Sequence, residues 1–406
     1  MNILFVTTDA YPYFGTTSNL IDKLLGGGVK SHNKIGVLSI CNQYSDKSHE
    51  IVKDVEIFRA PSYEYIHGID YIKHIVKYSV NEIIGSFAEK VIYTLRIKFS
   101  PGDHLIRDYN VRVLSQSIEY LTQERYDVVI AISGNYDSVV ALSVADTNAK
   151  KVFWQVDPCS TNLLRLPSEY YNSLALEKLI LKVFDAIFTP KLYYDELVKL
   201  HKRDISDNLH ILEFPLIDKR ETYIKDNNMK TKHCVFSGLI YSGIRDPRYT
   251  IKLFAEMNNP NICLDFVGVS FEEIPSDLRR YVNCHGRVEM SVATSYVDSA
   301  DFLVNIGNKM NNQIPSKLFE YISTGKPIIN ICKNRDCPSL DILKNYPLVI
   351  NLFEEEDKFE LQVIKLNEFI DKMIGKRVKF NYLEDNYRKY MPEYCAEVIK
   401  SVLYNL

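Results

Sequence analysis

The sequence predicts an α/β protein with two doubly wound domains, because short apolar segments alternate with longer helical segments through both halves of the chain. The apolar segments are rich in β-branched residues and lack strict polar alternation, which is typical of parallel sheets covered by helices on both faces. The chain has 406 residues, more than one hydrophobic core usually supports. We therefore expect two domains of ordinary size that face a central cleft.

The predicted strands define the domain boundaries. In the first half they are residues 2–8, 34–41, 55–61, 126–133, 151–156, 186–190 and 209–215. In the second half they are residues 233–239, 262–269, 281–286, 301–307, 327–332 and 348–353. Residues 216–232 are polar and charged, as in a linker between domains. We therefore predict an N-terminal domain over 1–216, a C-terminal domain over 217–384, and a helical segment over 385–406 that packs back on the N-terminal domain.

Composition and charge exclude several classes of protein. The 49 Lys and Arg residues nearly balance 52 Asp and Glu, so the net charge of -3 gives no electrostatic reason to expect nucleic acid as the main partner. The eight cysteines are scattered without a Cys-x-x-Cys pair, which indicates reduced thiols rather than disulfides or a zinc site. The first residues lack the pattern of a signal peptide, and no apolar run approaches a membrane span. These features favour a cytoplasmic protein.

One segment differs from the rest of the chain. Residues 71–100 have a helical pattern, many aromatic side chains, and five Lys or Arg against two Glu. A basic amphipathic helix of this kind can rest on anionic lipid headgroups. An ordinary surface helix with a solvated basic face is the alternative. Both remain open, so peripheral contact with the inner face of the plasma membrane is a hypothesis.

The stretch NNQIPSKLFEYISTGKPIINIC, residues 311–332, combines a short helical pattern with an unexpected polar face. Ser316, Lys317 and Glu320 lie on one side of the predicted helix. The helix follows the strand at 301–307, and ligands of open α/β sheets bind beyond the carboxyl ends of strands. Helix N-terminal amides attract phosphate, and a carboxylate accepts hydrogen bonds from a vicinal diol. The alternative is a solvated face of an amphipathic helix.

IPSKLFEYISTGKPII, residues 314–329, resembles the donor signature of retaining glycosyltransferases of GT-B architecture, the family-4 group that builds bacterial surface polysaccharides. The resemblance implies two Rossmann-like domains, the N-terminal one binding the acceptor and the C-terminal one the nucleotide sugar. It implies that Glu320 holds the nucleotide ribose and that the amides of Ser316 and Lys317 meet the diphosphate. The common pattern has a second glutamate that contacts the donor sugar, and Asn312 stands at that position here.

Two other stretches of the second half resemble the same family. In residues 236–254, Arg245 matches a basic residue that grips the diphosphate. The common pattern has another arginine directly after the first glycine, and Leu239 stands there instead. In NCHGRV, residues 283–288, Gly286 matches a loop where backbone groups meet the base. Alternatives are a surface ion pair for Arg245 and a purely structural role for His285.

The first half has weaker matches at three predicted strand ends. Gly15 and Thr16 resemble the family's glycine-containing loop under the donor sugar. Asp157 resembles an acidic position near the reacting sugar, and capping of the next helix is its alternative. Asp137 is expected either to contact the acceptor or, with more weight, to cap a helix.

These matches imply a specific reaction. No two aspartates stand two positions apart, so the metal-binding Asp-x-Asp motif of the other main glycosyltransferase architecture is absent and we expect no metal and no other cofactor. The resemblance implies a retaining hexosyltransferase that moves a sugar from a nucleotide sugar, UDP-sugar favoured, to a saccharide that we expect to be lipid-linked. Arg245, Lys317 and Asp157 are the expected catalytic residues. The alternatives are a non-catalytic partner subunit with this fold and a nucleotide-sugar epimerase of similar architecture.

Overall fold

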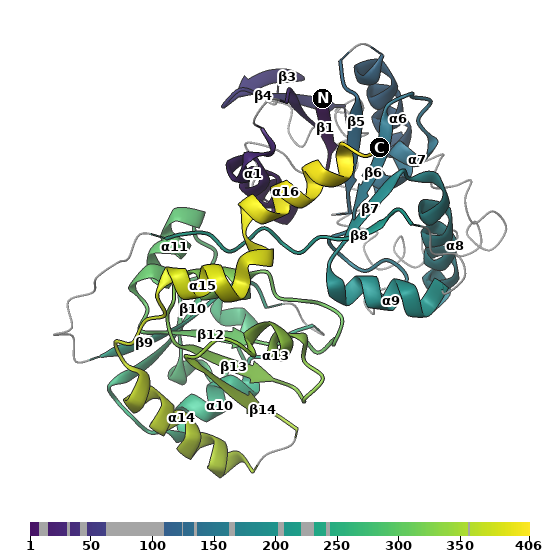
Figure 1. Ribbon diagram of the computed structural model, residues 1–406. Helices are drawn as coiled ribbons and strands as arrows, with labels where there is room; N and C mark the ends of the chain where they lie inside the picture. The colour runs from purple at the N-terminus through teal and green to yellow at the C-terminus, as the bar shows by residue number, and fades with distance from the viewer. Residues whose placement is uncertain are drawn as a thin grey trace, which may run out of the picture. The chain divides into compact units, whose positions relative to one another are not determined.

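A computed structural model of the chain describes residues 1–7, 15–30, 33–40, 47–61, 109–123, 125–133, 136–161, 167–201, 207–220, 231–240, 244–355 and 358–406. The chain forms two compact units (Figure 1). Unit 1 comprises Met1–Pro215 together with Pro392–Leu406, and unit 2 comprises Leu216–Met391. The chain therefore enters unit 2 one residue before the predicted boundary, and it returns to unit 1 at residue 392 rather than 385.

Unit 1 is built on an eight-stranded sheet in the order β3-β4-β2-β1-β5-β6-β7-β8. The strands are β1 (Ile3–Val6), β2 (Ile35–Ile40), β3 (His49–Val52), β4 (Val55–Ala60), β5 (Val128–Ile132), β6 (Lys150–Trp154), β7 (Ala186–Thr189) and β8 (Leu209–Ile211). All neighbours pair in parallel except β3 and β4. The order reverses direction around β1, as in a doubly wound fold.

The edge strand β3 (His49–Val52) is absent from the sequence prediction, which also expected only parallel pairing. β3 runs antiparallel to β4. The two-residue turn between them holds Lys53 at φ 49° and Asp54 at φ 60°. Such left-handed turns are usually marked by glycine or asparagine, so a Lys-Asp turn hides the hairpin from a search for turn residues.

Helices cover both faces of this sheet. They are α1 (Thr16–Leu24), α6 (Tyr109–Thr122), α7 (Asp137–Val144), α8 (Pro167–Val183), α9 (Lys191–His201) and α16 (Pro392–Leu403). The C-terminal helix α16 packs against α1 and the helical turn Leu25–Val29 that follows it. A Cβ added to Gly27 would lie 2.3 Å from the backbone carbon of Pro392. Glycine at this position therefore permits the close approach of the C-terminal helix.

Unit 2 contains a six-stranded, entirely parallel sheet in the order β11-β10-β9-β12-β13-β14. The strands are β9 (Lys232–Ser237), β10 (Ile262–Val267), β11 (Asn283–Cys284), β12 (Phe302–Ile306), β13 (Ile328–Cys332) and β14 (Val349–Phe353). The helices are α10 (Arg248–Glu256), α11 (Met290–Ser299), α12 (Lys317–Ser323), α13 (Pro338–Leu343), α14 (Phe359–Met373) and α15 (Phe380–Tyr387). In Figure 1, α10 and α14 lie on one face of the sheet and α11 and α15 on the other.

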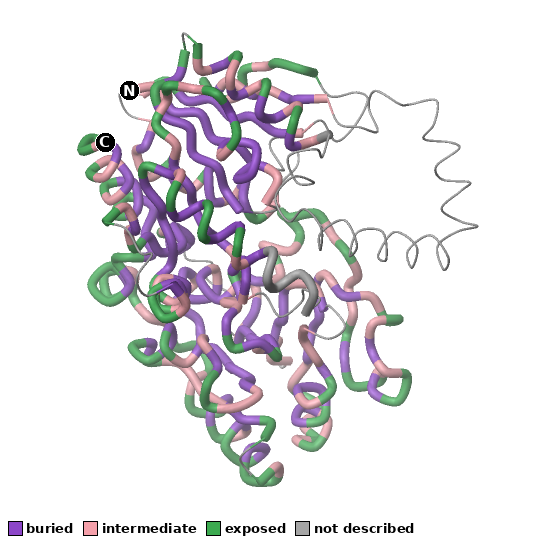
Figure 2. The backbone as a smooth tube through the Cα atoms, turned by 90° about the vertical axis from the view of Figure 1, so that its right-hand side faces the viewer, coloured by how far each residue is buried: buried purple, intermediate pink, exposed green. Residues whose placement is uncertain are grey.

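The sheets are the buried centres of both units, as the strand segments in Figure 2 show. The inner strand β12 is buried at all five positions, which is typical of parallel strands covered on both faces. The seven cysteines in the described ranges are free thiols, and five of them are buried. Burial of the central strands explains why continuous apolar runs, rather than alternating patterns, marked them in the sequence.

Candidate nucleotide-sugar site

The strand order of unit 2 identifies one sheet edge as the natural place for a ligand. β9 pairs with β10 on one side and β12 on the other, and the chain winds in opposite directions from this pair. Loops after two such strands diverge to opposite faces, which leaves a crevice at their carboxyl ends. Arg245 follows β9, whereas Asn312, Ser316 and Glu320 follow β12. The structure thus brings the main predicted donor residues to a single sheet edge.

Arg245 is half-buried, and two uncharged oxygen atoms accept hydrogen bonds from its guanidinium. Its Nη1 donates to the carbonyl of Leu239 at 3.2 Å, its Nη2 donates to Oδ1 of Asn308 at 2.9 Å, and its guanidinium lies 5.6 Å from the Phe236 ring centroid. A surface ion pair at this turn joins Asp246 to Arg248. Leu239, where the family pattern has a cation, therefore contributes its carbonyl to fixing the arginine that is present.

The loop between β12 and α12 contains a residue that the sequence did not single out. Asn308 is 7% exposed, accepts the hydrogen bond from Arg245 and donates to the carbonyl of Gln313 at 3.4 Å. Asn312, the residue at the family's glutamate position, is also buried, at 9% exposure. The available sequence signal for Asn308 was its place directly after Gly307, where the predicted strand at 301–307 ends. Such a pattern is too common to identify a site alone.

The helix α12 is short, which limits what its N-terminus can contribute to ligand binding. The helix begins at Lys317, with Ser316 as its N-cap, and spans only seven residues. The amides of Leu318 and Phe319 already bond to the carbonyls of Pro315 and Ser316. In this described stretch the amides of Ser316 and Lys317 have no hydrogen-bond acceptor. Because two turns carry a small dipole, charged side chains must supply most of any attraction for phosphate.

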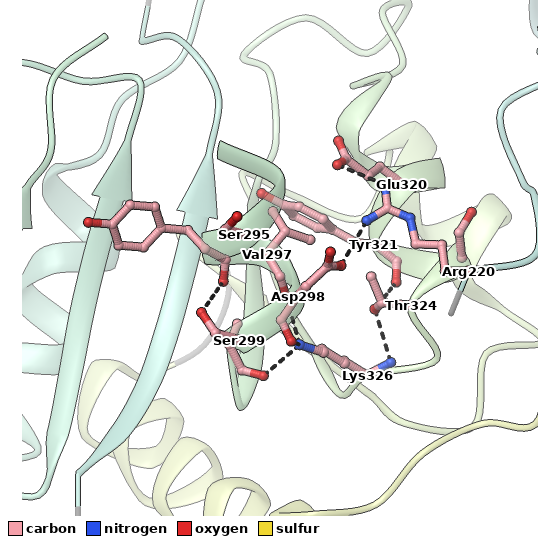
Figure 3. Close-up of polar contacts among 12 residues, drawn as sticks. Arg220, Ser295, Val297, Asp298, Ser299, Glu320, Tyr321, Thr324 and Lys326 are labelled. Carbon is pink, nitrogen blue, oxygen red and sulfur yellow. Dashed lines mark hydrogen bonds and ion pairs between the residues drawn. The ribbon is translucent and has the colours of Figure 1, made fainter. Parts of the chain in front are cut away.

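Glu320 pairs with two cations, and Figure 3 shows one of them, Arg220. Its Oε2 accepts from Nζ of Lys317 at 2.5 Å, and its Oε1 accepts from Nη2 of Arg220 at 2.9 Å. Burial would raise the pKa of Glu320, but the charges of Lys317 and Arg220 hold that pKa below its usual value. Lys317, which we expected to lie beside a diphosphate, therefore forms an ion pair with Glu320, the residue predicted to hold the ribose. Arg220 lies in the predicted linker, and nothing local in the sequence pointed to it.

Tyr321 connects α12 to the end of β9. Its hydroxyl accepts from the amide of Ser237 at 2.8 Å and is fully buried. Burial raises the pKa of this phenol, the charge of Glu320 raises it further, and the charge of Arg245 lowers it. Tyr321 therefore joins the helix that carries Glu320 to the end of the strand that precedes Arg245.

The loop at Gly286 has a clear backbone requirement. Gly286 has φ of 67°, its carbonyl accepts from the amide of Gly268 at 2.8 Å, and its own amide donates to Val269 at 3.0 Å. Both ring nitrogens of His285 are hydrogen-bonded, Nε2 to Asp265 at 2.9 Å and Nδ1 to the hydroxyl of Tyr296 at 3.0 Å. These contacts give His285 a structural role. Contact of this loop with a base stays a prediction.

Three of the predicted unit 1 residues occupy helix starts. Gly15 is the N-cap of α1, where its amide donates to Oγ of Ser18 at 2.8 Å, and Thr16 is the exposed first residue of that helix. Asp137 is the first residue of α7, where a carboxylate interacts favourably with the helix dipole. The N-cap residue of α7 is Tyr136. Asp137 therefore lies in the first turn and is not the cap that we expected.

Asp157 lies beyond the end of β6 and does not cap a described helix, because α8 begins ten residues later at Pro167. The backbone of Asp157 is fixed at both polar groups: its amide is 3.4 Å from Oγ of Ser133, and its carbonyl accepts from the Tyr136 hydroxyl at 3.1 Å. Burial raises the pKa of its carboxyl to about 6. A carboxylic acid with this pKa exchanges a proton near neutral pH, as a catalytic acid or base does.

The metal and membrane expectations are tested only in part. The described ranges contain no group of three or more His, Cys, Asp or Glu side chains placed to bind a metal ion, and the absence of a metal requirement stays a prediction. No helix among these ranges has the length and apolarity needed to cross a bilayer. The basic segment 71–100 lies outside the described residues.

Comparison with known proteins identifies the fold. No protein-family model matches the chain, and no curated protein matches its sequence. Among solved structures, sucrose-phosphate synthase from Thermosynechococcus elongatus superposes with a TM-score of 0.62 at 11% identity, covering 100% of this chain and 98% of that one. The lipopolysaccharide outer core galactosyltransferase WaaB gives 0.57 at 14% identity, with 100% and 99% coverage. An E. coli structure bound with UDP-2-fluoro glucose gives 0.62 at 11% identity, with 100% and 99% coverage. The chain therefore has the two-domain GT-B architecture.

Proposed function

We propose that this protein is a glycosyltransferase that moves a sugar from a nucleotide-diphosphate sugar, UDP-sugar favoured, to a saccharide acceptor. The observation that carries the proposal is the cluster at the carboxyl edge of β9 and β12. Arg245, the amides of Ser316 and Lys317, and the Glu320 carboxylate offer the cation, donors and diol acceptor that a nucleoside diphosphate requires. A full-length likeness to structures that include a galactosyltransferase and a UDP-sugar complex supports it.

In the proposed reaction the bond between the sugar's anomeric carbon and the diphosphate breaks, and the acceptor hydroxyl bonds to the same face of that carbon. The acceptor proton moves to the leaving diphosphate, so retention needs no strong protein nucleophile. Arg245 and Lys317 stabilise the charge that develops on the leaving group. Asp157 is proposed to face the reacting sugar. We further propose that the enzyme needs no metal and acts as a retaining hexosyltransferase.

We propose the acceptor and the location of the protein from the sequence alone. A lipid-linked saccharide at the cytoplasmic face of the plasma membrane fits the sequence resemblance to surface-polysaccharide enzymes and the basic composition of residues 71–100. Flotation of the full-length protein with anionic liposomes tests the membrane part. Recovery of the protein in the soluble fraction at low salt would remove it.

Nucleotide binding followed by turnover tests the main proposal. UDP, GDP and ADP are compared for their ability to raise the melting temperature, and the matching sugar nucleotides are then assayed for hydrolysis and transfer. Arg245→Ala is expected to lower turnover by roughly 10² or more, because it removes stabilisation of the leaving group. Arg248→Ala is the matched control, since that exposed arginine pairs with Asp246. If both variants keep the wild-type activity, Arg245 takes no part in the mechanism.

A non-catalytic partner subunit is the second candidate, favoured by Leu239 and Asn312 at positions where the family pattern has a cation and a glutamate. In that case the protein binds a nucleotide but gives no hydrolysis or transfer with any sugar nucleotide and acceptor tested. Activity that appears only after a second glycosyltransferase is added would identify the partner role. An epimerase would instead interconvert two sugar nucleotides without an acceptor, which chromatography of the nucleotide products detects.

A further inference from the structure

Arg220 bridges two carboxylates within unit 2, five residues after the chain leaves unit 1 at Pro215. Its Nη1 donates to Oδ1 of Asp298 at 3.1 Å, and its Nη2 donates to Oε1 of Glu320 at 2.9 Å. In Figure 3 the guanidinium lies between the two acidic side chains. Its side chain is 23% exposed, and that of Glu320 is 18% exposed. A partly buried, forked contact of this kind fixes both partners more firmly than a surface ion pair does.

We propose that Arg220 positions Glu320 to accept the two hydroxyl groups of an intact ribose diol, so that the site selects ribonucleotides over deoxyribonucleotides. The inference rests on the proposed function and adds a residue and a specificity to it. An ionised carboxylate has about four acceptor positions, two on each oxygen. Arg220 occupies one on Oε1 and Lys317 occupies one on Oε2. One acceptor position per oxygen remains, which matches two vicinal hydroxyl donors.

The support for Arg220 is itself rigid. Asp298 lies in the last turn of α11, and the carbonyls at this end accept from a single buried ammonium group. Nζ of Lys326, a residue only 3% exposed, donates to the carbonyls of Val297 and Ala300 at 2.8 Å each and to that of Asp298. A buried cation at a helix C-terminus satisfies carbonyls that have no partner within the helix. The end of α11 that carries Asp298 is therefore anchored, through Lys326, to the segment between α12 and β13.

Charge explains why an arginine is needed in addition to Lys317. Among the residues that the structure describes, the titratable or charged groups that face Glu320 are Lys317 and Tyr321 on its own helix, Arg220 on the entering segment, and Asp298 through Arg220. Burial alone would raise the pKa of Glu320, and the two cations oppose that effect. Without Arg220, Oε1 loses its donor and the carboxyl gains a proton at higher pH. A protonated carboxyl offers a donor where the ribose hydroxyl needs an acceptor.

The experiment measures the affinities of UDP and 2′-deoxy-UDP for the full-length protein by calorimetry. The variants are Arg220→Gln, Arg220→Lys and Glu320→Gln, and Lys232→Gln is the control. Lys232 makes a 3.3 Å ion pair with Asp371 at the amino end of β9, the opposite edge of the same sheet. We expect Arg220→Gln to weaken UDP roughly tenfold, as for loss of a hydrogen bond to a charged group, and to weaken 2′-deoxy-UDP by a smaller factor, because only the 3′ hydroxyl remains to bond with Glu320. Lys232→Gln should change neither affinity.

A pH profile separates positioning from general damage to the fold. Acidification lowers UDP affinity in every variant by protonating the diphosphate. The additional fall caused by protonation of Glu320 should begin at higher pH in Arg220→Gln than in the wild type. Arg220→Lys retains the charge but cannot span both carboxylates, so it should keep the wild-type pH profile with an intermediate affinity. If Arg220→Gln does not fold, as judged by circular dichroism, Arg220→Lys carries the test through its own ratio of UDP to 2′-deoxy-UDP affinity.

The outcomes distinguish the inference from the proposed function. The inference is overturned if the Arg220 variants lose equal affinity for UDP and 2′-deoxy-UDP, or lose affinity for neither. In that case the nucleotide site itself still stands, provided that the wild-type protein binds UDP. A wild-type protein that binds no nucleotide would overturn both. A selective loss for UDP, absent when Glu320→Gln is already present, would establish that Arg220 acts through the carboxylate.

Discussion

Asn308 holds Arg245 by a 2.9 Å hydrogen bond from Nη2 to Oδ1, and this bond joins the loop after β12 to the loop after β9. The two residues are 63 positions apart in the chain and meet because β9 and β12 are neighbours in the sheet. Asn308 is buried and Arg245 is half-buried. The orientation of the proposed phosphate-binding cation therefore depends on an amide that belongs to a different loop.

Replacement of Asn308 by alanine is expected to lower kcat/KM by roughly tenfold, because a hydrogen bond to a charged group contributes about 1.5–3 kcal/mol. The arginine remains present, so the loss should be smaller than in Arg245→Ala. Steady-state kinetics with a UDP-sugar, combined with UDP affinity, measures it. Asn334→Ala is the control, since Asn334 lies in an exposed turn near Glu355. A variant with unchanged kcat/KM would show that Arg245 is oriented without Asn308.

Asp157→Asn is expected to stabilise the protein at pH 8 more than at pH 5. The carboxyl has a pKa of about 6 in the folded protein and a lower one when unfolded, so the folded state disfavours the ionised form. The contribution of Asp157 is therefore most favourable at low pH and becomes unfavourable as pH rises through about 6. The gain at pH 8 should be on the order of 1–3 kcal/mol in denaturant unfolding.

Asp137→Asn is the matched control for that experiment. Asp137 lies in the first turn of α7, where its charge is favourable, so its removal should cost on the order of 0.5 kcal/mol at pH 8. A gain for Asp157→Asn that is equal at both pH values would contradict the assignment of the raised pKa to this carboxyl. Transfer activity measured in parallel tests whether the same group takes part in the reaction.

Lys326→Met is expected to destabilise unit 2 by about 2–4 kcal/mol, because three carbonyls at the end of α11 lose their donor inside the protein. Denaturant unfolding followed by circular dichroism measures this loss. Lys372→Met is the control: that lysine is 67% exposed and pairs with Glu368 along α14, so its change should stay within about 0.5 kcal/mol. Similar small effects in both variants would mean that water replaces the buried ammonium group.

Gly27→Ala and Gly26→Ala form a pair of adjacent substitutions with opposite expected signs. A methyl group at Gly27 would meet the backbone of Pro392 at 2.3 Å and should cost about 1–3 kcal/mol by forcing α16 away. Gly26 has nothing within 4 Å of its Cβ position, so alanine there should stabilise by up to about 1 kcal/mol. Thermal unfolding of both variants tests the contact. A stable Gly27→Ala protein would show that the C-terminal helix accommodates the methyl group.

The sequence predicted every strand that the structure describes except β3, and it placed Arg245 and Asn312 after predicted strands and Glu320 on the short helix that follows. Those predictions succeeded because central parallel strands need continuous apolar runs and because glycine and proline mark where the runs stop. β3 was missed because its Lys-Asp turn lacks the usual turn residues. Nothing in the sequence singled out Lys326, which is a buried ammonium group that supports the neighbouring helix.

By itself, the sequence determined the alternation of strands and helices and hence the two doubly wound units, since local apolar patterns decide which segments are buried. Only the tertiary structure decided which charges meet. Arg220 and Glu320 are 100 residues apart, and Arg245 and Asn308 are 63 apart. Arg245 and Asn308 meet because β9 and β12 are neighbours in the sheet, and Arg220 reaches Glu320 from the segment that enters unit 2. Such contacts depend on the packing of whole sheets and segments and leave no mark in any local stretch of residues.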